Sequence, residues 1–150
     1  MYRRIENLQA VLENHLIYLE TGDLAKCADL SSVDLSAADL TGANLTGANL
    51  SHANLSFADL SFADLTGVDL SFVDLSFAYL SGVDLSGVNL SHADLSDANL
   101  TGANLTGANL SFANLSGADL SGVDLSGVDL SHAYLIDTDL NCAEGLNGKK

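Results

Sequence analysis

Serine, histidine and aspartate are the residues of this chain that could do chemistry, and all three recur at regular spacing. His52, His92 and His132 follow one another at intervals of forty residues, and each comes directly after a serine. A serine beside a histidine could be a nucleophile with its general base, and clustered histidines could bind a metal. Whether either is possible depends on the elements that position these side chains.

Leucine occupies every fifth position from Leu30 to Leu140, 23 times without exception, which marks a repeat protein. Alanine or valine usually stands two residues before each leucine, aspartate or asparagine directly before it, and serine or threonine directly after it. Tyr79 and Tyr134 are exceptions in the aspartate slot. A straight helix would spread these leucines over all its sides, and a straight strand would alternate them between two faces. Three extended residues followed by a turn bury both apolar slots and leave the other three outward.

Two columns in the variable fifth slot predict the size of one coil. Glycine recurs every twenty residues, at 47, 67, 87, 107 and 127, and aromatic residues or histidines recur at 52, 72, 92, 112 and 132. Twenty residues, or four units, therefore close one coil, and about six coils fit between 28 and 147. At ~4.8 Å per coil the stack is ~29 Å tall. One expected core column is Leu30, Leu50, Leu70, Leu90, Leu110 and Leu130.

With this unit the chain resembles a pentapeptide repeat protein, and its lead-in resembles those of cyanobacterial members. The resemblance implies an all-β solenoid, a right-handed quadrilateral β-helix, and this sequence adds a short N-terminal α-helical cap. We expect a capping helix and lead-in over 1–26, the β-helix over 27–147 and a tail at 148–150. The uniform repeat is consistent with either recent duplication or consensus design.

Both ends of the solenoid need cover. The 3,4,4,3 spacing of apolar residues predicts an amphipathic helix over 2–20 that stops near Gly22; the residues of this stripe are Ile5, Leu8, Leu12, Leu16 and Leu19. We expect this helix to cap the first coil, with a partner-binding helix as the alternative. At the other end only Leu146 could cover the last coil, so a monomer and an end-to-end dimer through the C-terminal coil both remain open.

The formal charge of -15, from 20 acidic and 5 basic residues, disfavours direct nucleic acid binding and membrane surfaces, and it favours a basic protein surface as partner. No apolar run could span a membrane, and three glutamates interrupt residues 1–20, so a cytoplasmic location is predicted. The expected acidic surface is Asp59, Asp64, Asp69, Asp74, Asp84, Asp119, Asp124 and Asp129. Carboxylates one coil apart repel by ~0.9 kcal/mol in water, so moderate salt is expected to stabilise the fold.

Residues 27–148 carry sixteen carboxylates, about one per 1.8 Å of the expected stack, close to the charge density of B-DNA. Some members of the family that this chain resembles are thought to mimic DNA and shield type II topoisomerases. A DNA-mimicking protein that binds a type II topoisomerase is therefore the alternative function. Against it, aspartate is a good turn residue, asparagine often takes its slot, and nothing interrupts the repeat to form a projecting loop.

All five phenylalanines fall in the outward fifth slot. Exposed rings near one another predict an interaction patch of His52, Phe57, Phe62, Phe72, Phe77 and His92. The alternative is that the rings only stack on one another and shield the backbone. Phe72 and Phe112 separate the histidines by ~10 Å, too far to share a metal. Every serine is explained by its repeat slot, and a smooth prism should offer no pocket. The sequence thus predicts a noncatalytic scaffold or interaction module without a cofactor.

Overall fold

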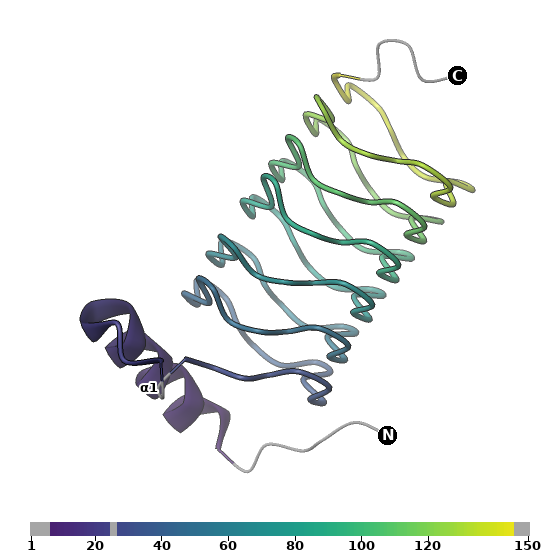
Figure 1. The fold of residues 1–150 in the computed structure, drawn as a ribbon. Coiled ribbons are helices and arrows are strands. Elements are labelled where there is room, and N and C mark those ends of the chain that lie inside the picture. The colour runs from purple at the N-terminus through teal and green to yellow at the C-terminus, as the bar shows by residue number, and fades with distance from the viewer. Residues whose placement is uncertain (1–6, 25–26, 146–150) are drawn as a thin grey trace.

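The computed structural model describes residues 7–24 and 27–145. Within them one helix, α1 (Leu8–Thr21), precedes a stack of coils that runs to the C-terminal end of the described chain (Figure 1). No extended strand lies in these two ranges; isolated parallel bridges join the coils instead. The predicted tail at 148–150, and the proposed covers Ile5 and Leu146, lie outside the described residues.

Every bridge joins a residue to the one twenty positions later, from Asp29 with Asn49 to Asp124 with Glu144. The twenty-residue coil predicted from the glycine and ring columns is therefore confirmed. Four faces follow from these bridges, and each is named by its first bridging residue: face 1 from Asp29, face 2 from Asp34, face 3 from Asp39 and face 4 from Asn44. Adding twenty repeatedly gives the other residues of each face.

One bridge shows how a unit is held. The N–H of Asn54 donates to the carbonyl of Val33 at 2.8 Å, and its own carbonyl accepts from the N–H of Leu35 at 2.7 Å. Within the chain, the N–H of Val33 donates back to the carbonyl of Leu30 at 3.2 Å and closes a four-residue turn. Each unit thus satisfies its backbone partly in its own turn and partly in the next coil.

The fifth slot is the third residue of each turn, and from Ser32 to Cys142 every residue there has a φ between 55° and 73°. A positive φ at this position alone is the mark of a type II turn, which glycine adopts without strain. Thirteen of these 23 slots hold another residue, at a cost of about 1–2 kcal/mol each. The turns form four corners: corner 1 follows face 1 and starts at Ser32, and corners 2, 3 and 4 start at 37, 42 and 47.

The interior contains the leucine slot and the alanine or valine slot of each unit. Of the six leucines in the first core column, Leu30, Leu50, Leu70, Leu90 and Leu110 are fully buried. Leu130 is only partly buried because it lies in the last described coil, where no further coil covers it. Burying each inner leucine contributes about 1.5–3 kcal/mol.

Helix α1 begins and ends with specific caps. The Asn7 side chain accepts the N–H of Ala10 at 3.0 Å, and Gly22, in the left-handed region, donates its N–H to the carbonyl of Tyr18 at 2.7 Å. The predicted stop at Gly22 is confirmed. The predicted start at residue 2 falls outside the described residues, and the helix is described from Leu8.

Helix α1 lies against the N-terminal end of the stack (Figure 1). Leu8, Val11 and Leu12 pack against the core, whereas Leu16 is half exposed. The most deeply buried residue of the helix is His15, whose Nδ1 accepts the N–H of Ala28 at 3.2 Å. Sequence periodicity did not single out His15, because its burial depends on the first coil and not on the helix's own apolar stripe.

Candidate interaction surface

The aspartate and asparagine side chains of the faces have a local structural task. In most units the Oδ1 atom accepts the backbone N–H two residues later, as Asp59 accepts from Ser61 at 2.9 Å. Several serine hydroxyls donate to the same oxygen, such as Ser76 to Asp74 at 2.7 Å. The turn chemistry therefore explains these residues without a ligand.

The expected acidic surface does not form one patch. Its eight carboxylates are spread over all four faces: Asp69 and Asp129 on face 1, Asp74 on face 2, Asp59 and Asp119 on face 3, and Asp64, Asp84 and Asp124 on face 4. All eight are exposed or half-buried. Because they surround the stack, no single face concentrates the negative field.

Asparagines also link neighbouring coils. The Nδ2 group of Asn104 donates to Asp84 at 3.2 Å, and Asn54 and Asn114 donate in the same way to Asp34 and Asp94. In each pair the asparagine lies one coil beyond the aspartate. The asparagines therefore replace a like-charge contact with a hydrogen bond, and they also make the net charge less negative.

Changing Asn104→Asp is expected to destabilise the fold by about 0.5–1.5 kcal/mol at low salt, because a hydrogen bond becomes a carboxylate repulsion. Asn99→Asp, which faces Tyr79 in the preceding coil, should cost less. Urea unfolding at 20 mM and 300 mM NaCl would measure both. Salt should narrow the gap and raise the melting temperature of the wild type; a wild type that melts lower in NaCl would contradict the repulsion.

Hydrogen bonds lower the pKa of four face carboxylates. The Ser121 hydroxyl and then its backbone N–H hold the pKa of Asp119 below its ordinary value of 3.8. Ser126 and Thr41 do the same for Asp124 and Asp39, and Thr66 acts on Asp64 first through its backbone N–H. A lowered folded pKa means that this stability is present above the ordinary value and is lost as pH falls through the folded one.

We therefore expect Ser121→Ala to lower the melting temperature at pH 6, with the difference from wild type shrinking as the pH drops below the ordinary aspartate value of 3.8. Melting curves followed by circular dichroism between pH 6 and pH 2.5 would measure it. Ser71→Ala is the matched control. Asp69 accepts a hydrogen bond from the backbone N–H of Ser71, and alanine retains that N–H. A Ser121→Ala deficit that stays constant with pH would contradict the carboxylate's part in it.

Corner 1 carries a continuous stack of five rings. The members alternate between histidine and phenylalanine and lie parallel, with centroids 4.6–4.9 Å apart; they are His52, Phe72, His92, Phe112 and His132. Stacked aromatic pairs are worth about 0.5–1.5 kcal/mol each, which offsets the strain of their positive φ. The stacked-ladder interpretation thus describes this corner.

The other predicted patch residues occupy different corners. Phe57 and Phe77 stack on corner 2 with centroids 4.8 Å apart, and Phe62 lies on corner 3 over Gly82. The structure therefore separates His52, Phe72 and His92 from these three. It adds Tyr79, which the prediction of the patch omitted: this ring is half exposed on face 3, between corners 2 and 3. Its departure from the aspartate slot was the available sequence signal.

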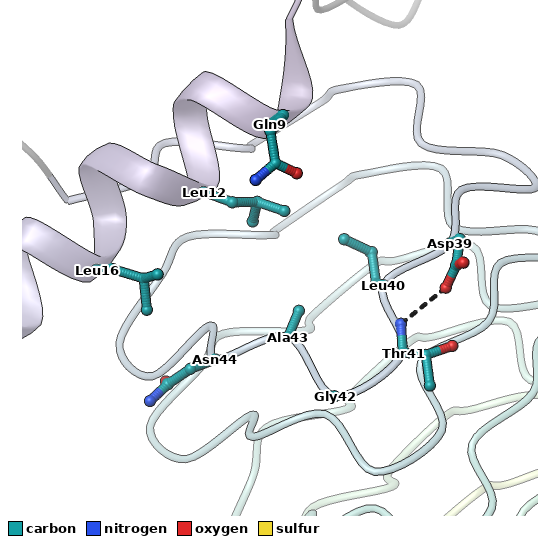
Figure 2. A pocket seen from close by; sticks show the side chains of 9 residues that line it. All are labelled: Gln9, Leu12, Leu16, Asp39, Leu40, Thr41, Gly42, Ala43 and Asn44. Carbon is teal, nitrogen blue, oxygen red and sulfur yellow. Dashed lines mark hydrogen bonds between the residues drawn. The ribbon is translucent and has the colours of Figure 1, made fainter.

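A cleft of about 400 Å³ lies where α1 meets the first coil (Figure 2). Leu12 and Leu16 of the helix face Ala43 across it, and Asp39 stands at the coil side, accepting the N–H of Thr41 at 3.1 Å. The expectation that the surface has no pocket is therefore wrong at this junction. The helix packs beside the coil and leaves a gap that a plain prism would not have.

The family model "Pentapeptide repeats (8 copies)" matches residues 28–67, 63–102 and 103–141. The chain belongs to the pentapeptide repeat family. Proteins of this family form right-handed quadrilateral β-helices and are generally structural or interaction proteins. No curated protein matches the chain in sequence. In the described part of this pentapeptide repeat protein, no helix combines the length and the apolar character that crossing a bilayer requires.

Three solved pentapeptide repeat proteins are similar to this one. HetL, involved in heterocyst differentiation regulation in the cyanobacterium Nostoc, is 39% identical over 82% of this chain, with a TM-score of 0.40. A protein from the Arabidopsis thaliana thylakoid lumen is 33% identical, covering 67% of each chain, with a TM-score of 0.51. A second Nostoc protein is 32% identical over 90% of this chain and 96% of its own, with a TM-score of 0.39. The chain spans 62% of the length of HetL.

Proposed function

We propose that this chain is a noncatalytic interaction scaffold that presents side chains from a rigid, right-handed, four-sided β-helix to a basic protein partner. The observation that carries the proposal is the group of exposed rings Phe57, Phe62, Phe77 and Tyr79 within a negative field. Turn chemistry explains nearly every other outward residue, and core packing explains the inward ones. Exposed rings that lie close together favour protein binding. The proposal divides the chain into a cap at 1–26, a β-helix at 27–147 and a tail at 148–150, and it locates the protein in the cytoplasm.

Affinity capture with purified wild type and a variant tests this function. The variant carries Asp59→Asn, Asp64→Asn, Asp69→Asn and Asp74→Asn, which retain the turn acceptors and remove four charges from all four faces. A protein that is captured by the wild type, lost with the variant and bound again after purification supports the scaffold. If no protein depends on the surface carboxylates, the scaffold proposal fails.

End-to-end pairing through the C-terminal coil is part of this proposal. Tyr134, Leu135 and Ile136 are exposed in the last coil, and Leu135, a core-slot leucine, is 39% exposed. A second copy would cover these groups. Sedimentation of the full chain at 10–500 µM should show a dimer that Leu135→Asp disrupts, and a strict monomer at the highest concentration would contradict the pairing.

The second candidate is a DNA mimic for a type II topoisomerase, and the axial density of carboxylates is the observation in its favour. The distribution of those carboxylates over all four faces, as around a DNA duplex, is consistent with it. A gyrase supercoiling assay with and without the protein discriminates between the two candidates. Inhibition or protection of gyrase favours the mimic, and no effect at micromolar protein removes it.

A further inference from the structure

Face 3 carries an exposed aromatic cluster in its second and third coils. Phe57 and Phe77 are at its corner 2 edge, Phe62 is at its corner 3 edge, and Tyr79 lies on the face between them. Their exposed fractions run from 45% for Phe77 to 73% for Phe62. The two edges are joined by a three-residue extended segment about 10 Å long, so the four rings form one surface.

No ring stacking offsets the backbone strain at position 62. Its φ of 61° favours glycine, and glycine fills the slots directly before and after it on corner 3, Gly42 and Gly82. Phe57 and Phe77 offset the same strain by stacking on each other. Phe62 stacks on no ring among the described residues and lies over Gly82. A strained, mostly exposed phenylalanine points to a role outside the fold.

Face 3 also carries two carboxylates in the same part of the stack. Asp39 and Asp59 bridge each other on face 3, with no asparagine between them to donate a hydrogen bond. The residues that precede Phe57 and Phe62 on their corners are Ala37 and Gly42, neither of which carries a ring, and no described residue beyond its chain neighbours lies within 4 Å of the Cβ position of Gly42. Ring faces beside paired carboxylates suit a guanidinium group, which binds both. All five lysines and arginines of the chain lie outside the described residues.

The same turn of the first coil also borders the cleft beside α1. Asp39 and Gly42 line that cleft together with Leu12 and Leu16 (Figure 2). A ligand held by Asp39 can therefore place an apolar group against the two leucines. An extended peptide segment can supply both groups, because side chains two residues apart point to the same side of the segment.

We propose that face 3, from the cleft beside α1 to Tyr79, docks an extended arginine-containing segment of a partner protein. A guanidinium group lies against Phe57 or Phe62 and pairs with Asp39 and Asp59, and an apolar side chain two residues away in the segment enters the cleft beside Leu12 and Leu16. This inference rests on the proposed scaffold function and names the face that carries it.

The test measures binding of fluorescein-labelled six-residue peptides to the full chain by anisotropy. The probe places leucine and arginine two residues apart, with glycine between them, so that both side chains face the protein; the matched peptides replace arginine with glutamate, or leucine with glycine. The central variant is Phe62→Gly, which installs the residue that the turn favours and should fold at least as well as wild type. Its control is Phe112→Gly, the same change in the same slot on corner 1.

We expect Phe62→Gly to raise the Kd of the leucine–arginine peptide at least fivefold, and Phe112→Gly to change it less than twofold. Asp59→Asn should weaken binding at least threefold more than Asp69→Asn, which removes the same charge from face 1. Equal effects of Asp59→Asn and Asp69→Asn would show general charge attraction and overturn the proposal, as would no binding at 1 mM probe. If face 3 variants bind the peptide normally while the protein still captures a partner, the choice of face 3 is wrong and the scaffold function stands.

Discussion

Leu95→Ala is expected to destabilise the protein by about 2–5 kcal/mol, the largest loss from any conservative change in the stack. Leu95 is completely buried in a central coil, with further coils on both sides. Alanine there loses the transfer free energy of the leucine side chain and leaves a cavity. Hydrogen-bonded coils above and below hold that cavity open, because the backbone cannot move inward without breaking bridges.

Urea unfolding followed by circular dichroism measures this loss. Leu135→Ala is the matched control, since it removes the same atoms from a leucine that is 39% exposed in the last described coil. It should cost less than half as much, because its surroundings can relax and part of its surface is already in water. Equal losses at the two positions would contradict the cavity argument. A linear stack also unfolds from its ends, so Leu95→Ala should broaden the transition more than Leu135→Ala.

His92→Val is the second large effect, with an expected loss of about 2–4 kcal/mol although its side chain is exposed. The His92 ring stacks between Phe72 at 4.6 Å and Phe112 at 4.9 Å, and its φ is 60°. Valine removes both stacking contacts and places a β-branched side chain in the left-handed region, where it is least tolerated.

His92→Gly separates the two causes. Glycine also removes both stacking contacts, but it relieves the backbone strain, so its stability should stay within about 1 kcal/mol of the wild type. Thermal and urea unfolding of both variants at pH 8 would measure the difference. If valine and glycine are equally destabilising, backbone conformation has no part in the choice of residue at the corners, and the argument about Phe62 loses its basis.

Much of the fold can be predicted from single residues because the repeat is local. One leucine in every five predicts the core because it reflects one turn, and glycine every twenty residues predicts the coil because the same corner returns after four turns. The stop of α1 at Gly22 could be predicted for the same reason. The twenty-residue register also distributes the six patch residues over three separate corners, as the structure has them, whereas Tyr79 became relevant only once face 3 placed it between two of these corners.

The repeat sequence by itself determined the unit, the twenty-residue register and the outward position of every phenylalanine, because each follows from the five-residue unit or from residue columns that recur every twenty positions. Tertiary structure alone decided the burial of His15 and the cleft beside α1. These features depend on how the helix packs on the first coil. Such contacts join segments with no common local pattern, so no spacing in the sequence could have predicted them.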